Sequence, residues 1–397
     1  MKTDFFSTSK LPPYLFEAMH ILKMQVAAQG VEIIDFGMGN PDLPPPDFVI
    51  EKMQHLVQNP KLYRYSLVGG IDLLKKAHCA YYQRRFGVDL DYKTQSLVTI
   101  GAKEGLTSLA TALSGDDNYF VVPSPSYPIH TSAFKIAKTK VYNINAQNSV
   151  DFLQKFKDFV ENIEKKPLGV IINFPCNPTT ETVSLGFYQE LVDFCRHHKI
   201  YIISDIAYCE LYFDEKYKPC SILEAVGAKD VAIEFSTVSK SFSMGGARLG
   251  FAAGNAILVN ALYKIKSYLD YSSFEPLQIA AVDCLSEKSD EYLQNLRARY
   301  KKRAEFLVKK LNEELGWDVE MSKATMFLWT KLPMQFSYMT SFDFCKKLLE
   351  ETGVAISAGS GFGEAGEGFV RFSLIHDEED IIRAIAKMKE FQKIRIF

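Results

Sequence analysis

The sequence is organised around one stretch, Phe235-Ser236-Thr237-Val238-Ser239-Lys240, continued by Ser241-Phe242-Ser243-Met244-Gly245-Gly246-Ala247-Arg248-Leu249-Gly250. It places one lysine just beyond an apolar, β-rich run and one arginine eight positions later. A lone lysine at the end of a strand is usually a solvated surface charge. The alternative is an amine in a poorly solvated pocket near other cations, where its neutral, nucleophilic form is favoured. The rest of the chain has to distinguish these two interpretations.

Length and composition describe an ordinary globular protein. The chain has 397 residues, of which 47% are hydrophobic and 24% charged, so we expect a sizeable core and two domains. A formal net charge of −2 gives no electrostatic footprint for nucleic acid or an anionic membrane. The seven cysteines lack any Cys-x-x-Cys spacing, so neither a disulfide framework nor a metal site is expected. No signal-peptide pattern or membrane-length apolar run is present, and a cytoplasmic location is expected.

The hydrophobic pattern predicts the fold class. From about residue 48 to 285, helices alternate with short, continuously apolar strands, which is typical of a parallel sheet covered on both faces. Strands are expected at 97–100, 119–122, 168–174, 200–205, 231–237 and 249–253. The pattern therefore predicts an α/β fold whose large, mostly parallel-sheet domain spans 48–285.

The pattern of helices and strands changes near residue 290. A long charged helix is followed by expected strands at 325–330, 354–357 and 369–374 and by helices at 341–351 and 377–397. This predicts a smaller α+β domain at 286–397. The arm 1–47 is expected to join it, with a helix that starts after Leu11-Pro12-Pro13 and ends near Ala28, and a strand at 33–36.

One connection suggests an anion site. The expected strand 97–100 leads into Gly101-Ala102-Lys103 and then into a helix, whose first N–H groups are free to bind an anion. Strand–glycine–helix is also a very common connection, so alone it indicates only a tight turn. The run from Gly359 to Gly363 has no helix after it and is expected to be a flexible loop between strands. The anion-site prediction therefore depends on Gly101 to Lys103 together with Arg248.

Polar residues follow other expected strands, where ligands bind in open α/β sheets. Asp205 closes an apolar strand and Tyr208 follows three positions later; Asp205 is either a helix cap or a carboxylate that keeps a heterocyclic nitrogen protonated. Asn177 precedes a proline and Tyr127 lies between prolines, so a turn and packing are their ordinary interpretations. Arg371, inside an apolar strand, must bind a carboxylate or face water.

Taken together, these segments resemble the pyridoxal-phosphate-dependent class I/II aminotransferases of fold type I, over essentially the whole chain. The segments that carry the resemblance are Gly39-Asn40-Pro41-Asp42, Gly101-Ala102-Lys103, Ser126-Tyr127-Pro128, Asn177-Pro178-Thr179, Asp205-x-x-Tyr208, Ser239-Lys240, Gly246-x-Arg248-x-Gly250 and Arg371-Phe372-Ser373. Within that family the stretches 124–130 and 266–278 look most like the bacterial alanine (glutamate–pyruvate) transaminases. Aspartate transaminases are the alternative.

The resemblance implies roles for the central residues. Lys240 would bind pyridoxal 5'-phosphate covalently and, once displaced by substrate, would move the substrate's Cα proton. Asp205 would keep the pyridine nitrogen protonated. Tyr208 and Asn177 would hydrogen-bond the phenolic oxygen of the ring, and Tyr127 would stack on its face.

The resemblance also implies how both anionic groups are held. The phosphate would be bound by the amides of Ala102 and Lys103, the hydroxyls of Thr237 and Ser239, the guanidinium of Arg248, and Tyr65 of a neighbouring subunit. Arg371, with Asn177 and the backbone at Gly39, would bind the substrate's α-carboxylate. A homodimer with shared active sites follows from the resemblance.

The implied reaction is ping-pong transamination between an L-amino acid, with alanine and glutamate favoured, and a 2-oxo acid such as pyruvate or 2-oxoglutarate. Aspartate transaminases use a second arginine for the distal carboxylate, but the corresponding loop, residues 270–274, has none; Lys103 is the nearest candidate cation. A carbon–sulfur β-lyase is a rival with the same cofactor. A regulator that kept the fold and lost the reaction is less favoured, because Lys240 and Asp205 are both present.

Overall fold

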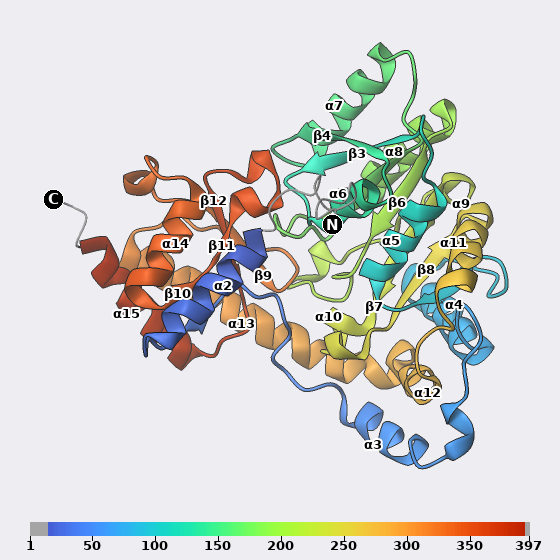
Figure 1. Cartoon of the computed structure of the whole chain (residues 1–397), viewed down its shortest axis with the longest axis horizontal. Coiled ribbons are helices and arrows are strands. Elements are labelled where there is room, and N and C mark those ends of the chain that lie inside the picture. Colours follow the sequence, from blue (N-terminus) through green and yellow to red (C-terminus); the bar gives the residue numbers. More distant parts are fainter. Residues whose placement is uncertain (1–14, 394–397) are drawn as a thin grey trace, which may run out of the picture.

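A computed structural model of the chain describes residues 15–393. Two parts lie side by side, and the long helix α13 (Asp290–Leu315) runs from one towards the other (Figure 1). The larger part contains the central sheet, and the smaller part contains the C-terminal strands and helices. The predicted start of the first helix, after Pro13, and residues 394–397 of the last predicted helix lie outside the described residues.

The central sheet has seven strands in the order β2-β8-β7-β6-β5-β3-β4. These strands are β2 (Ser96–Thr99), β3 (Tyr119–Ser124), β4 (Lys140–Asn145), β5 (Gly169–Asn173), β6 (Tyr201–Asp205), β7 (Ala232–Thr237) and β8 (Gly250–Gly254). The run from β4 to β7 is parallel, whereas β8 is antiparallel to both β7 and β2. The prediction of an α/β fold with a mostly parallel sheet is confirmed.

Helices cover both faces of this sheet. Its central strands are buried on both sides, so successive side chains of β5 enter different cores: Val170 and Ile172 belong to one cluster and Ile171 to the other. The helices of the larger part are α3 (Asp47–Leu56), α4 (Asp72–Phe86), α5 (Ala102–Ala112), α6 (Ile129–Ile136), α7 (Ser149–Asn162), α8 (Leu185–His198), α9 (Ala228–Val231), α10 (Val238–Ser241), α11 (Ala256–Leu269) and α12 (Glu275–Ala281). The sheet is thus fixed between two apolar layers, with its strand ends left for polar groups.

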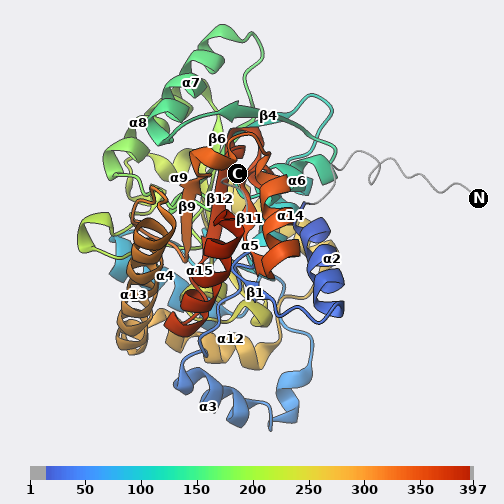
Figure 2. The same ribbon diagram turned by 90° about the vertical axis from the view of Figure 1, so that its left-hand side faces the viewer.

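The smaller part has its own core and two small sheets. An antiparallel sheet has the order β11 (Ser357–Ala358), β12 (Phe369–Ser373), β9 (Phe327–Lys331), and β1 (Ile34–Asp35) pairs in parallel with β10 (Val354–Ala355). The helices are α2 (Leu15–Ala28), α13, α14 (Ser341–Thr352) and α15 (Glu378–Lys393). Figure 2 shows α13 and α15 packed along each other, with α2 on the opposite side beside α14.

Two predictions about elements are wrong in detail, and one strand was not predicted. The strand expected at 354–357 is two strands, because Val354 pairs with Ile34 whereas Ser357 pairs with Arg371 in the other sheet. The loop expected at 359–363 contains a packed 3-10 turn, Gly359–Phe362, in which a Cβ at Gly359 would lie 2.0 Å from the carbonyl oxygen of Gly366. Strand β4 was missed because its residues are exposed or half-buried, so it lacks the apolar run of an inner strand.

The N-terminal segment joins the smaller part. Met19 and Val26 of α2 and Ile34 of β1 are buried in the same apolar cluster as the C-terminal helices. The apolar clusters of the larger part lie mostly between residues 49 and 293. The domain boundaries at 47/48 and 285/286 stay predictions.

Candidate active site

A cavity of about 710 Å³ lies at the carboxyl ends of the parallel strands and is closed on one side by residues of the smaller part. It brings together every predicted site residue except Tyr65. The predicted residues that line it are Gly39, Ala102, Lys103, Tyr127, Asn177, Asp205, Tyr208, Thr237, Ser239, Lys240, Arg248 and Arg371. These residues are spread over the sequence from Gly39 to Arg371, and they come together only in the folded chain.

Lys240 follows β7 on the single turn α10. Its Nζ donates to the carbonyl oxygen of Gly39 at 2.5 Å. Burial, and then the positive charges of Arg371 and Arg248, lower the pKa of Lys240 to about 8. A much larger fraction of this amine is therefore neutral near pH 7 than for an ordinary lysine, and a neutral amine is a nucleophile and a base.

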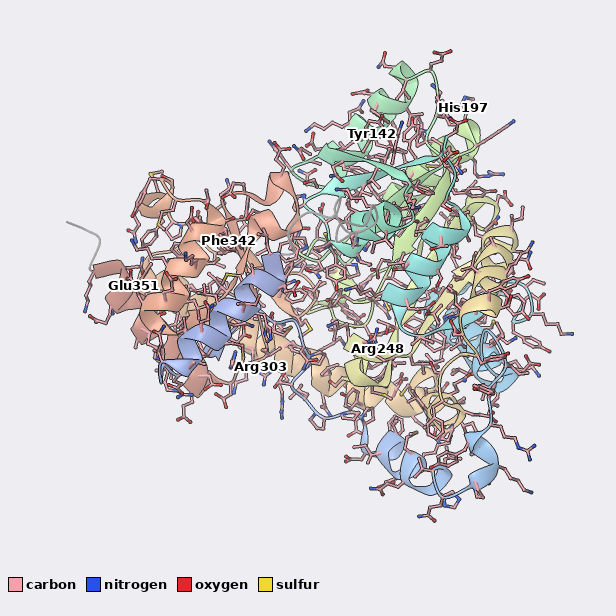
Figure 3. All side chains as sticks on the ribbon, in the orientation of Figure 1. Tyr142, His197, Arg248, Arg303, Phe342 and Glu351 are labelled. Carbon is pink, nitrogen blue, oxygen red and sulfur yellow. The ribbon has the colours of Figure 1, made fainter. Side chains whose placement is uncertain are left out.

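The space beside Lys240 is lined by anion-binding groups. Gly101 is the N-cap of α5, with φ +79° and no side-chain cap, so no side chain covers the amides of the first turn. A Cβ at Gly101 would lie 2.5 Å from Nη2 of Arg248, which means that this guanidinium lies directly against the helix start. Figure 3 labels Arg248 close to α10. Amides at a helix start and a guanidinium are the donors that a phosphate dianion requires.

Two hydroxyls complete this end of the cavity. Thr237 Oγ1 lies 2.8 Å from Ser239 Oγ and 2.8 Å from the carbonyl oxygen of Leu249, and it accepts from the amide of Ser239 at 3.1 Å. Thr237 thus caps α10 and fixes the turn that carries Lys240. The donor set as a whole fits the phosphate of pyridoxal 5'-phosphate.

Asp205 ends β6, and its carboxylate has two partners. Oδ1 accepts from the amide of Ala207 at 3.0 Å, and Oδ2 lies 3.0 Å from Nε2 of His130. The other ring nitrogen of His130, which is fully buried, lies 2.7 Å from Ser126 Oγ. Sequence reasoning missed this histidine; the four-residue spacing from Ser126, at the start of a helix, was the available signal.

Arg371 on β12 closes the opposite side of the cavity. Its Nη1 donates to Asn177 Oδ1 at 2.7 Å and its Nη2 to the carbonyl oxygen of Gly37 at 3.0 Å. The backbone amide of Asn177 donates to Asn173 Oδ1 at 2.9 Å, and Asn173 Nδ2 donates to the backbone carbonyl oxygen of Asp205 at 2.7 Å. Sequence reasoning also missed Asn173, although it lies at the end of an expected strand.

The guanidinium of Arg371 is held by aromatic rings as well. It lies 4.0 Å from the ring centroid of Phe327 and 4.7 Å from that of Phe362, and the side chain is buried. Gly39 stands next to this arrangement, since a Cβ there would lie 2.8 Å from the Phe327 ring. Arg371 contacts the backbone at Gly37, whereas the Gly39 carbonyl accepts from Lys240.

Two tyrosines form part of the cavity wall. Tyr208 packs edge-on against Phe327 with centroids 5.5 Å apart, and burial raises the pKa of its hydroxyl far above the ordinary value. Tyr208 is therefore a neutral hydroxyl at physiological pH. Tyr127 lies edge-on to His130, with centroids 5.9 Å apart.

Tyr65 does not reach the cavity of its own chain. It is 85% exposed and packs against Tyr271, with ring centroids 4.8 Å apart. The neighbouring Tyr63 packs against Phe274 at 5.2 Å. These four residues form an exposed surface, here called the aromatic patch.

This fold and site define a pyridoxal-phosphate enzyme of fold type I, and comparisons with known proteins give the family. The model for aminotransferase class I and II matches residues 31–388. The chain is 41% identical over 385 residues to glutamate-pyruvate aminotransferase AlaC of Escherichia coli, covering 97% of this chain and 93% of that one. It is 39% identical over 380 residues to LL-diaminopimelate aminotransferase of Maridesulfovibrio salexigens, covering 96% and 97%. Substrate-bound BacF from Bacillus subtilis superposes with a TM-score of 0.92 at 31% identity, over 98% of both chains.

The chain belongs to the class I and II aminotransferases. It is therefore an enzyme that depends on pyridoxal phosphate and acts on amino acids and 2-oxo acids. Between residues 15 and 393, no helix is long and apolar enough to cross a membrane.

Proposed function

We propose that this aminotransferase exchanges amino groups between alanine or glutamate and pyruvate or 2-oxoglutarate by a ping-pong mechanism. One observation carries the chemistry: a lysine amine with a lowered pKa and a buried arginine share one cavity. The similarity to glutamate-pyruvate aminotransferase AlaC supports this choice of substrates.

Lys240 is the proton-transfer residue of the proposal. Bound pyridoxal phosphate supplies an aldehyde and an electron-withdrawing ring. Neutral Nζ of Lys240 accepts the Cα proton of the substrate and later returns a proton to the product side. The contact with the Gly39 carbonyl, at 2.5 Å, holds this amine on the cavity side of α10.

Asp205 would hold the cofactor's ring nitrogen. Its negative charge would keep that nitrogen protonated, and His130 and Ser126 hold the carboxylate in place. Tyr208 and the side-chain amide of Asn177 would donate hydrogen bonds to the ring's phenolic oxygen, and Tyr127 would stack on the ring.

The anion-binding end takes the phosphate. The amides of Ala102 and Lys103, the hydroxyls of Thr237 and Ser239, and Arg248 surround it in the proposal. These donors bind without changing during the reaction, so they position the ring rather than take part in the chemistry.

Arg371 takes the substrate's α-carboxylate, because a planar guanidinium binds a carboxylate through two parallel hydrogen bonds. The two phenylalanine rings and the acceptors at Gly37 and Asn177 fix its plane in advance. Binding therefore costs little reorganisation, and the Cα–H bond is directed towards Lys240. Gly39 leaves the room that the substrate needs beside Arg371.

Lys103 is the residue proposed to bind the distal carboxylate of a substrate such as glutamate. It is exposed and lines the cavity, so its ammonium can approach a glutamate side chain yet leave room for the methyl group of alanine. Lys103→Ala should raise the Michaelis constants for glutamate and 2-oxoglutarate and leave those for alanine and pyruvate unchanged. Unchanged constants for glutamate and 2-oxoglutarate would remove Lys103 from the proposal.

The proposal includes a homodimer in the cytoplasm. The aromatic patch exposes four neighbouring aromatic side chains, and exposed apolar surface of this kind marks association sites. In a dimer formed through it, Tyr65 of each chain reaches the phosphate bound by the other.

The decisive experiment is a panel assay of the purified protein. It should contain bound cofactor with visible absorbance, and it should exchange amino groups between alanine, glutamate and their oxo acids. Lys240→Ala should abolish both turnover and the absorbance of the covalently bound cofactor. Activity retained in this variant would refute the assignment of Lys240.

Other substrates are distinguished by the same panel. Aspartate as the preferred donor would support an aspartate aminotransferase, and pyruvate release from cysteine conjugates without an oxo-acid acceptor would indicate a carbon–sulfur β-lyase. LL-diaminopimelate belongs in the panel because several relatives 36–39% identical to this chain act on it by name.

A further inference from the structure

Lys266, in the last turn of α11, is fully buried although it carries a charge. Its Nζ lies 3.0 Å from Glu104 Oε2 and 2.8 Å from Asp270 Oδ2. A buried ammonium with two carboxylates is costly to desolvate, so its partners must be held in good geometry. Neither Lys266 nor its two partners has a part in the reaction proposed above.

The first partner connects Lys266 to the start of α5. Glu104 Oε2 also accepts from the amide of Ile100 at 2.8 Å, and Glu104 Oε1 accepts from Ser108 Oγ at 2.6 Å. Ile100 is the residue immediately before Gly101, so the carboxylate reaches back over the helix start. Because Glu104 bonds there, it does not cover the amides of Ala102 and Lys103 that face the cavity.

The second partner connects Lys266 to Arg248. Asp270 Oδ1 accepts from the amide of Ser272 at 2.8 Å and so shapes the loop after α11. In that loop, Ser273 Oγ donates to the carbonyl oxygen of Arg248 at 3.2 Å. Arg248 itself has a left-handed backbone, φ +53°, which these contacts help to hold.

We propose that Lys266 is a positioning residue for the phosphate end of the site. One ammonium joins the two halves of that end, the α5 start through Glu104 and the Arg248 segment through Asp270. Its positive charge also offsets part of the negative charge of the two carboxylates, which would otherwise oppose a phosphate dianion nearby. The inference rests on the proposed function only for the identity of the anion.

The proposal predicts a loss that is specific to the phosphate. In Lys266→Met, the dissociation constant of pyridoxal 5'-phosphate should rise about 10- to 100-fold, the range seen when a residue that supports the ligands of a bound metal ion is replaced. The dissociation constant of pyridoxal, which lacks the phosphate, should change less than about twofold, since the carboxylates oppose only a charged group. Both constants are measured by absorbance titration of the full-length protein after cofactor removal.

Two comparisons separate this role from a general loss of structure. Lys264→Met removes an exposed lysine from the same helix and should change neither constant. The double variant Lys266→Met with Asp270→Asn should recover part of the affinity for pyridoxal 5'-phosphate, because one uncompensated carboxylate is gone. Equal weakening of both aldehydes by Lys266→Met, or no weakening of either, would overturn the proposal.

If Lys266→Met does not fold, Lys266→Gln provides the test, because it removes the charge and keeps a polar group between the two carboxylates. More inorganic phosphate should then be needed to protect the cofactor-free variant against heat than the wild type. Protection at the wild-type concentration would overturn the proposal. A wild-type protein that binds pyridoxal 5'-phosphate without transaminating would overturn the proposed function and leave this test intact.

Discussion

At the scale of single residues, the charge state of Lys240 is set by its surroundings. Burial is the largest cause of its lowered pKa, followed by Arg371 and then Arg248. Both arginines bind anions in the proposed function, so the groups that hold the two anions also raise the neutral fraction of the amine. One arrangement of charges therefore serves binding and reactivity together.

This arrangement predicts a pH profile. In the cofactor-free protein, the reaction of Lys240 with an amine-selective acylating reagent should speed up as pH rises and level off above about 8, because only the neutral amine reacts. Arg371→Leu removes a positive charge and should move the midpoint to higher pH. Modification at Lys240 is followed by peptide mass spectrometry, and a midpoint near 10.5, the ordinary lysine value, would contradict the prediction.

The same shift affects stability. The folded-state pKa of Lys240 is lower than its unfolded value of 10.5, so the unfolded chain binds more protons between pH 8 and 10.5. The contribution of Lys240 to the free energy of unfolding should therefore rise with pH through this window. Denaturant unfolding of cofactor-free wild type and Lys240→Met at pH 8 and pH 10 measures this contribution. The wild type should lose unfolding free energy relative to Lys240→Met when the pH is lowered from 10 to 8. An unchanged difference between the two proteins would contradict the prediction.

His130 is predicted to hold the Asp205 carboxylate in place and not to take part in the reaction itself. His130→Phe removes the side-chain partner of Asp205 and should lower kcat about tenfold, whereas Asp205→Ala should lower it by a further factor of ten or more. His130→Asn, which keeps a polar group near the carboxylate, should recover part of the loss. Equal activities of His130→Phe and Asp205→Ala would show that the histidine does more than hold the carboxylate.

At the scale of elements, the start of α5 is the most sensitive feature. Gly101 has φ +79° and ψ 157°, which only glycine adopts readily, and a Cβ there would meet Arg248. Gly101→Ala should cost about 1–3 kcal/mol of unfolding free energy and also weaken cofactor binding. Thermal unfolding and titration with pyridoxal 5'-phosphate measure the two effects.

Gly87 provides the matched control. It also has a positive φ, +68°, at the end of α4, but nothing lies within 4 Å of its Cβ position. Gly87→Ala should lower stability, by about 1 kcal/mol, without changing cofactor affinity. Weakened binding in Gly87→Ala to the same degree as in Gly101→Ala would mean that strain, and not the contact with Arg248, explains the loss.

The elements also show how far sequence reasoning reaches. Continuous apolar runs predicted the inner strands to within two residues, because burial on both faces leaves a clear pattern. An edge strand such as β4 leaves none, and the antiparallel direction of β8 depends on a connection rather than on composition. Most residues of the cavity were predictable because they lie at or just after the end of a strand, and Arg371 because it is a charge inside an apolar strand. The contacts of His130 and Asn173 with Asp205 were not predictable, since they join elements distant in sequence.

At the scale of the whole molecule, the aromatic patch predicts a homodimer with shared sites. Wild type should sediment as a dimer, and Tyr271→Asp should weaken association because it places a charge in the patch. Tyr65→Ala alone should reduce cofactor affinity in the dimer. Analytical ultracentrifugation checks the first two expectations, and a wild-type monomer would contradict the proposed interface.

Mixed dimers test the sharing directly. Tyr65→Ala and Lys240→Ala chains are each impaired, but a mixed dimer contains one site with Lys240 from one chain and Tyr65 from the other. Co-expression should therefore restore up to half of the wild-type activity per dimer if Tyr65 acts across the interface. Activity no greater than the average of the two parents would place Tyr65 outside the partner's site.

The pairing of β1 with β10 has a practical consequence for anyone who alters the N-terminal end of this enzyme. That pairing fixes the backbone just before Gly37 and Gly39, whose carbonyl oxygens contact Arg371 and Lys240 respectively. Three residues of main chain, 37–39, thus join the carboxylate-binding side to the amine. Shortened versions, fusions and libraries should keep residues 34–39 unchanged, since an edit there disturbs both halves of the site at once.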